Sequence, residues 1–419
     1  MSLQLNVYPV NEVTVSDNAD WQDGHLSINY QDLLSQVMKD IRLVNVTFDL
    51  VRPGESARVI HVLDIIRPRI KDDGTPCFPG ILARTNSGGE GVTNDLEGIL
   101  VATCAFVEGS NPMYTPKEGV IDFSGPGAQL SPFSNNHLLV MNLEFGDGLP
   151  SEEVDESIRL ASARIATVLA GITLGCQPNS QKIIDTTPKE QGLPAIGVIM
   201  QLRGEGPLRS NYIAGHPVND ILPTYVRYEQ MADGLIMGEN FTYASQKNYT
   251  CQYQKNDLLE ILSTRNDLSL AGVVPVKGGA QTTEAKWRMA SLAANLLQRL
   301  GAEGVIVTTE GAGNSHIDTM YASQECERRS ICSVLLLNEM SDIDGKDSGF
   351  VDFVPEANAI VSVGNREEIV ELPTVTRVLG GTFILGKNIT ATGVIKLPLR
   401  YICGATNEMG AWKIGAEAF

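Results

Sequence analysis

Between residues 195 and 363 the chain alternates short, uninterrupted apolar runs with amphipathic segments, and this alternation restricts the fold more than any other feature. The runs of strand length are residues 195–202, 270–276, 305–309, 332–338 and 357–363. Strands without polar alternation are those that are covered on both faces of a sheet. Strand–helix–strand repeats indicate parallel pairing. The sequence therefore predicts an α/β fold whose main part is a doubly wound, largely parallel sheet.

Amphipathic segments supply the helices of this pattern. Residues 284–300 carry Trp287, Ala290 and Leu297 on one stripe and end at Gly301. Residues 151–170 begin with several acidic side chains, which complement the positive end of a helix dipole, and Ser151 is the expected N-cap. We expect a further helix over residues 319–329.

The first 150 residues have a different character, because strands and turns dominate them. Residues 43–51 alternate as a strand does, and turn-rich clusters such as Arg52-Pro53-Gly54-Glu55 separate such segments. A short helix is expected over residues 30–40. We therefore predict three parts, namely a mostly-β N-terminal domain (1–150), an α/β domain (151–370) and a C-terminal segment (371–419) that packs back on the core.

The carboxyl ends of the predicted parallel strands mark the expected ligand site, because doubly wound sheets bind ligands there. The loop from Glu310 to Asn314 follows one of these strands. We expect Glu310 to recognise an ammonium group and Asn314 to position a carboxylate or the neighbouring backbone. Ser124, Gly125 and Gly127 form a second candidate wall, since glycines let backbone approach a ligand closely. The same Gly-Pro-Gly sequence is more often only a turn.

The amino-acid composition argues against two classes of binding partner. With 32 Lys plus Arg against 50 Asp plus Glu, the formal net charge is −18, which argues against binding to nucleic acid or to an anionic membrane. No stretch reaches the roughly 18 apolar residues that span a bilayer, and residues 1–19 lack the pattern of a secretory signal. The seven cysteines are scattered and odd in number, as is typical of reduced thiols. We expect a cytoplasmic protein.

Standard catalytic motifs are missing from the sequence, which contains no Walker-type loop, no His-Glu-x-x-His and no Cys-x-x-Cys. Gly311-Ala312-Gly313 lacks the third glycine of a dinucleotide-binding loop. His316 and Asp318 suit a metal or mutual orientation, but they suit a surface or helix-start position better. We predict no metal site.

Residues 237–257 interrupt the strand–helix alternation. They read MGENFTYASQKNYTCQYQKND, which is polar and aromatic, without a clear period, and long for a connection in a compact α/β domain. Within them Thr250 precedes Cys251. Such a cysteine can undergo an N-to-S acyl shift and elimination that leave an amino-terminal pyruvoyl group, an electron sink for an amine. This segment is therefore a candidate processing loop, although most isolated cysteines are inert.

A set of short stretches, in a fixed order along the chain, carries a resemblance to a known family. The stretches are Arg52-Pro53-Gly54-Glu55-Ser56, residues 64–69, Phe78-Pro79-Gly80, residues 122–128, residues 131–134, Pro223-Thr224, Asp233-Gly234, Glu310-Gly311, Gly313-Asn314, Asp344-Gly345 and residues 404–408. Together they resemble the substrate-binding proprotein subunit of component B of glycine/sarcosine/betaine reductase, which is related to the D-proline reductase proprotein.

The resemblance implies an oxidoreductase complex that cleaves a carbon–nitrogen bond of a small amino acid or N-substituted amine. This chain would be its substrate-binding subunit, in a hetero-oligomer with a partner subunit that carries a selenocysteine or cysteine nucleophile. In glycine-type members a pyruvoyl group captures the amine as a Schiff base, and the partner's selenolate displaces the activated nitrogen.

One position departs from the family pattern. The residue after Asn240 is the pyruvoyl-forming cysteine of glycine-type subunits, and here it is Phe241, which cannot form a thioester. The pair Thr250-Cys251 is similar to the cleavage site of D-proline reductase. Thr250 and Cys251 are therefore the candidate catalytic residues, and a pyruvoyl group derived from Cys251 is the candidate cofactor. Two alternatives stay open, namely an uncleaved, non-catalytic scaffolding homologue and a free-standing protein that binds a small metabolite.

Overall fold

A computed structural model describes residues 2–107, 117–187, 192–206, 208–341, 346, 349–384, 389–406 and 409 of the chain. Two of the stretches that carry the family resemblance, Asp344-Gly345 and Asn407-Glu408, lie outside these ranges. Within the ranges, no helix combines the length and the apolar character that crossing a membrane requires.

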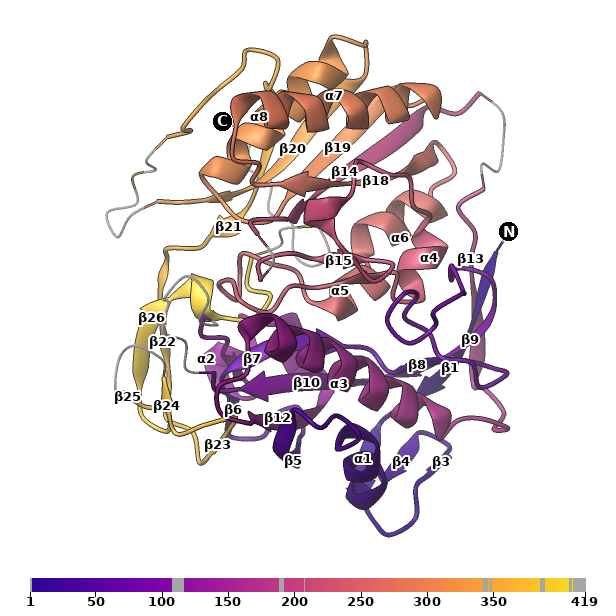
Figure 1. Cartoon of the computed structure of the whole chain (residues 1–419), viewed down its shortest axis with the longest axis vertical. Helices are drawn as coiled ribbons and strands as arrows, with labels where there is room; N and C mark the ends of the chain where they lie inside the picture. The colour runs from indigo at the N-terminus through magenta and orange to yellow at the C-terminus, as the bar shows by residue number, and fades with distance from the viewer. Residues whose placement is uncertain are drawn as a thin grey trace.

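A five-stranded, wholly parallel sheet forms the upper part of the molecule in Figure 1. Its strands are β14 (Ala195–Arg203), β18 (Ser269–Gly278), β19 (Gly304–Thr309), β20 (Cys332–Glu339) and β21 (Ile360–Asn365), and they lie side by side in the order β18-β14-β19-β20-β21. Counted along the chain this order is 2-1-3-4-5, so the winding reverses between β14 and β19, as in doubly wound sheets.

Helices cover both faces of the sheet, which explains why its strands lack polar alternation. On one face, α7 (Thr283–Arg299) and α8 (Asn314–Glu327) share a core with Ile199 of β14. On the other, α4 (Tyr228–Ala232) and α6 (Asp257–Thr264) share a core with Val198. The predicted fold class is confirmed.

The N-terminal part contains small sheets of mixed pairing, most of it antiparallel. One sheet has the order β5 (Leu43–Val51), β12 (His137–Phe145), β10 (Ile99–Ala105) and β7 (Val62–Ile66); another has β13 (Ser180–Ile184), β1 (Leu3–Pro9), β9 (Gly91–Glu97) and β8 (Arg69–Lys71). Helices α1 (Tyr30–Val37) and α3 (Ser151–Gly171) share the core of this part. The predicted domain boundaries at residues 150 and 370 stay a prediction.

Shorter elements complete the description. They are β2 (Glu12–Val15), β3 (Asp20–Gln22), β4 (His25–Ile28), β11 (Ile121–Asp122), α2 (Gly125–Ala128), β15 (Tyr212–Ile213), β16 (His216–Pro217), β17 (Ile236–Met237) and α5 (Thr250–Gln254), with 3₁₀ turns at Pro132–Asn135, Val218–Asp220 and Leu399–Tyr401. Figure 1 shows α5 between the parallel sheet and the N-terminal part.

Three predictions about element ends are wrong. Ser151 is the first residue of α3 and not its N-cap, because Pro150 occupies the cap position with φ −58° and ψ 143°. Helix α8 begins at Asn314, well before residue 319, since Gly313, at a positive φ of 66°, turns the chain directly into the helix. Strand β21 begins at Ile360 and not at residue 357.

The chain after residue 370 packs on the N-terminal part, beside β6 (Ala57–Val59) in Figure 1. Strand β23 (Arg377–Leu379) pairs in parallel with β6, and β22 (Ile369–Leu372) pairs with β26 (Ile395–Pro398), as does β24 (Phe383–Ile384) with β25 (Ile389–Thr390). His61, which follows β6, contacts this C-terminal segment. Its Nε2 is 3.1 Å from the carbonyl oxygen of Phe383, and its ring meets Phe106 edge-on.

We expect acid to weaken this packing through His61. Burial lowers the pKa of His61 from 6.5 to about 4, so the folded chain binds the proton less tightly than the unfolded chain does. The contribution of His61 to stability is therefore complete above about pH 6.5 and is lost as the pH falls toward about 4, by up to about 3 kcal/mol. Urea unfolding between about pH 7.5 and about pH 4.5 measures this loss.

A matched pair of variants isolates the effect. His61→Asn keeps a residue that tolerates the positive φ of 58° and should flatten the acid limb of the stability profile. His216→Gln, at an exposed position of β16, should leave the profile unchanged. Equal acid limbs in the wild type and His61→Asn would refute the assignment.

Candidate functional site

Glu310 follows β19 directly at the point where the strand order reverses, which is the crevice where such sheets bind ligands. Its side chain is nonetheless buried. One carboxylate oxygen accepts hydrogen bonds from the Arg203 amide at 2.7 Å and from the Asn211 side chain. The other accepts from the amide and side chain of Asn248, at 2.9 and 3.0 Å, and from the Tyr253 hydroxyl. These bonds join the end of β14 to α5 and to the segment before it.

We refer to residues 238–249 as the central segment. It is irregular, as predicted, but nearly all of it is buried, and the prediction missed helix α5 at its end. Polar groups within it satisfy one another, since the Glu239 carboxylate accepts from the amides of Phe241 and Thr242. Lys247 Nζ donates to the carbonyls of Leu63 in β7 and Glu239, at 2.6 and 2.8 Å. Burying an irregular segment would destabilise the fold if its polar groups had no hydrogen-bond partners. Here the backbone and the side chains find such partners.

Helix α3 holds the central segment from the N-terminal side. Asn240 Nδ2 donates to Asp155 at 2.8 Å, and Asp155 forms a buried ion pair with Arg159 one turn later. The guanidinium of Arg159 lies over the ring of Tyr212, 3.6 Å from its centre, and burial lowers the pKa of Arg159. The central segment is thus clamped between α3 and the carboxyl edge of the parallel sheet.

Thr250 opens α5 against Asp64 of β7. Its hydroxyl donates to one oxygen of Asp64 at 2.7 Å and its amide to the other at 3.0 Å, while the hydroxyl accepts from the Gly238 amide at 3.0 Å. Burial raises the pKa of Asp64. Cys251 lies in an apolar cluster with Ile65. Burial, and then the charge of Asp64, raise the pKa of the Cys251 thiol well above its usual range.

These surroundings do not fit a cysteine that forms a pyruvoyl group. An acyl shift begins with a thiolate, and an apolar environment with a neighbouring carboxylate disfavours that charge. The alternative position, Phe241, is fully buried and has no nucleophile. We therefore derive no chemical step through a pyruvoyl group.

The structure brings Glu310, Thr250 and Cys251 together around the central segment, but the other predicted site residues make their contacts elsewhere. Asn314 is exposed, and its carbonyl accepts from Lys286 at 3.0 Å. Ser124, Gly125 and Gly127 surround the start of α2, where a Cβ on Gly127 would lie only 2.7 Å from the Asp122 side chain and one on Gly125 would meet Pro373 of the C-terminal segment. Binding roles for these residues stay predictions.

Several residues that build the site were not singled out from the sequence. Asn211, Tyr253 and Arg159 are ordinary polar residues whose partners lie far along the chain. Asp64 carried a local signal, because it is a carboxylate in the middle of a strand whose other residues are apolar. A charge at such a position requires a partner in the folded state.

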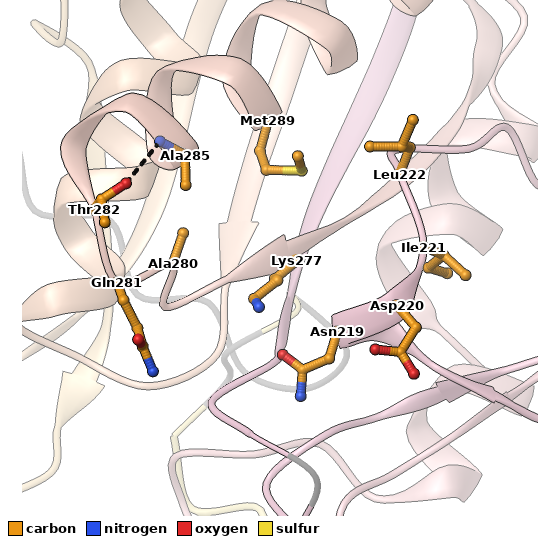
Figure 2. Close-up of a pocket in the computed structure, with 10 residues that line it drawn as sticks. All are labelled: Asn219, Asp220, Ile221, Leu222, Lys277, Ala280, Gln281, Thr282, Ala285 and Met289. Carbon is orange, nitrogen blue, oxygen red and sulfur yellow. Dashed lines mark hydrogen bonds between the residues drawn. The ribbon is translucent and has the colours of Figure 1, made fainter.

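A cleft opens at the same edge of the sheet, beyond the end of β14. Two adjoining cavities of ≈ 320 and ≈ 360 Å³ have in common Asn219, Asp220, Lys277 and Gln281. Figure 2 shows Lys277 at the centre, with Asn219 and Asp220 below it and apolar side chains above. Tyr212, which stacks on Arg159, lines the second cavity, so the cleft reaches the clamp of the central segment.

Comparison with known proteins gives the chain a family context. The family model described as glycine/sarcosine/betaine reductase component B subunits matches residues 1–417. The chain is 29% identical to the glycine reductase complex component B subunits alpha and beta of Acetoanaerobium sticklandii, over 100% of both chains. It is 30% identical to the sarcosine reductase complex component B subunit alpha of Peptoclostridium acidaminophilum, over 91% of this chain and 89% of the relative.

A more distant similarity is 25% identity to a D-proline reductase proprotein of Acetoanaerobium sticklandii, over 34% of this chain and 24% of the relative. No solved structure matches the chain.

Proposed function

This chain belongs to the family of glycine/sarcosine/betaine reductase component B subunits, and we propose that it is the substrate-binding subunit of such a complex. The family makes it an oxidoreductase component that acts with other subunits. The proposed reaction is the reductive cleavage of a carbon–nitrogen bond in a small amino acid or an N-substituted amine. The proposed nucleophile is a selenol or thiol on a partner subunit.

The placement of the cysteines is the observation that supports a substrate-binding chain and a nucleophile on a partner subunit. Cys332 is the exposed cysteine of the chain, while Cys176 is half-buried and the remaining ones are buried. Cys332 opens β20, opposite Gly304 at the start of β19, and therefore lies at the amino edge of the sheet. Glu310 and the cleft lie at the carboxyl edge. This placement supports a nucleophile on another polypeptide, because the exposed cysteine of the chain lies at the opposite edge of the sheet from Glu310.

A binding experiment tests the proposal. The purified chain, alone and with the partner subunits of its complex, is titrated calorimetrically with glycine, sarcosine and betaine. We expect one of these to bind, and we expect cleavage of the carbon–nitrogen bond only when the partner is present. Cleavage by the chain alone would contradict the proposal. A complex that turns over the substrate while this chain binds none of it would favour the scaffolding alternative, which Phe241 supports.

Intact-mass spectrometry tests whether the chain is processed. Because the Cys251 thiol is buried and its pKa is raised, we expect a single polypeptide of 45.3 kDa in the purified complex. Cys251→Ala should have the same intact mass apart from the substitution and should keep full activity with the partner. Two fragments that meet between Thr250 and Cys251, together with loss of activity in Cys251→Ala, would restore the pyruvoyl hypothesis.

A further inference from the structure

The cleft beyond β14 combines a cation, acceptor groups and an apolar wall. Lys277, near the end of β18, is half-buried, and its ammonium group forms no hydrogen bond or ion pair with the described residues. Gly204 allows this arrangement, because a Cβ there would lie 2.9 Å from Lys277 Cγ and 3.4 Å from the side-chain oxygen of Asn219. Lysine seldom remains in a cavity without an anionic or polar partner, so the position suits the acid group of a ligand.

Acceptors lie on the same side of the cleft. The side-chain oxygen of Asn219 is buried without a hydrogen-bond partner in the described part of the chain, while its nitrogen donates to the Gly206 carbonyl at 2.5 Å. That bond fixes which way the amide faces. Asp220 is exposed, lines both cavities and forms no ion pair with Lys277 among the described residues. These oxygens suit a protonated amine on the ligand.

Apolar side chains line the upper part of the cleft. Ile221, Leu222, Ala285 and Met289 line it, and Leu222 is 62% exposed although it is a large hydrophobic residue. Figure 2 shows Met289 and Leu222 above Lys277, with Asn219 and Asp220 below it and Ile221 next to Asp220. Binding of an aliphatic group over this surface is favourable, because it removes apolar area from water.

We propose that this cleft is a binding site for an amino acid with an aliphatic side chain of about four carbons. Lys277 binds the carboxylate, Asp220 and the Asn219 oxygen bind the ammonium group, and the apolar wall covers the side chain. The two cavities reach the size range of small-molecule sites. Glycine, sarcosine and betaine carry no group that would cover the apolar wall, so the site goes beyond the proposed reaction.

The experiment uses leucine and three probes that each lack one part of it. They are 4-methylpentanoate without the amine, 3-methylbutylamine without the carboxylate, and alanine, which keeps only a methyl group in place of the aliphatic side chain. Titration calorimetry on the full chain should show leucine binding in the millimolar range or tighter, and each probe binding at least about tenfold more weakly, as expected for the loss of one charge-assisted contact or a buried side chain.

Variants locate the site. Lys277→Met should weaken leucine binding about tenfold and remove the preference for leucine over 3-methylbutylamine. Asp220→Asn should remove the preference over 4-methylpentanoate. Lys396→Met, at a lysine that is 70% exposed in β26, is the matched control and should bind as the wild type does. Thermal melting confirms that each variant is folded.

No detectable leucine binding at millimolar concentrations, or unchanged binding in a folded Lys277→Met variant, would overturn the proposal. Equal affinity for leucine and alanine would refute the role of the apolar wall. None of these measurements requires the reductase partner, so a failure here leaves the proposed function standing.

Discussion

Replacing Glu310 by glutamine is expected to lower the free energy of unfolding by about 3–5 kcal/mol. Each carboxylate oxygen accepts a backbone amide, that of Arg203 on one side and that of Asn248 on the other. Glutamine offers one acceptor oxygen and places an NH₂ group opposite the second amide. A buried donor without a partner costs about 1–3 kcal/mol, and the lost charge-assisted bonds add to this cost.

Urea unfolding measures the loss, and amide hydrogen exchange at Arg203 and Asn248 shows whether the central segment loosens. Glu205→Gln, just beyond the end of the neighbouring strand β14, is the matched control. Its side chain is 26% exposed and pairs weakly with Arg203 and Arg209, at 3.4 and 3.7 Å, so we expect a cost below about 1 kcal/mol. Similar costs for the two variants would show that Glu310 does not hold the segment.

Replacing Arg58 by methionine is expected to destabilise the protein by about 3–5 kcal/mol. Arg58 and Asp122 form a bidentate pair at 2.6 and 2.8 Å with neither side chain exposed. The same guanidinium donates to the carbonyls of Pro373, Ala391 and Gly393, at 2.7, 2.6 and 3.1 Å, and so joins β6 to the C-terminal segment. Without Arg58, Asp122 is left as an uncompensated buried carboxylate, and burial already raises its pKa.

Arg377→Met is the control for Arg58, because Arg377 also joins the C-terminal segment to the N-terminal part. It is 38% exposed and pairs with the partly exposed Asp49 and Glu55, so its loss should cost about 1 kcal/mol or less. A double variant, Arg58→Met with Asp122→Leu, should recover part of the loss, since both buried charges are then removed. A cost for Arg58→Met no larger than that of Arg377→Met would contradict the assignment.

The strands and helices of the parallel sheet were predictable because their signals are local. An apolar run such as residues 195–202 or an amphipathic stripe such as residues 284–300 reports which faces are covered, and the structure places β14 and α7 within a residue of those bounds. Element ends were less predictable. Asn314 begins α8 because of the backbone turn at Gly313, which hydrophobic periodicity does not record.

The sequence predicted where the candidate site lies but not which residues contact one another there. The rule about strand ends led to Glu310, and the irregular composition of residues 237–257 indicated an unusual segment. Neither observation indicated that the two meet, because the hydrogen bonds between Glu310 and Asn248 or Tyr253 join residues about sixty positions apart. The resemblance identified the family correctly, but it did not indicate that Cys251 lies in an apolar cluster beside Asp64.

The sequence by itself determined the alternation of strands and helices and identified the family. Both can be recognised from short stretches of neighbouring residues. Tertiary structure decided which carboxylates are buried, which thiol is exposed, and which lysine faces a cleft. Those properties depend on desolvation and on partners that come from distant parts of the chain. Asp64, Asp155 and Glu310, for example, accept hydrogen bonds from Thr250, Asn240 and Asn248, respectively.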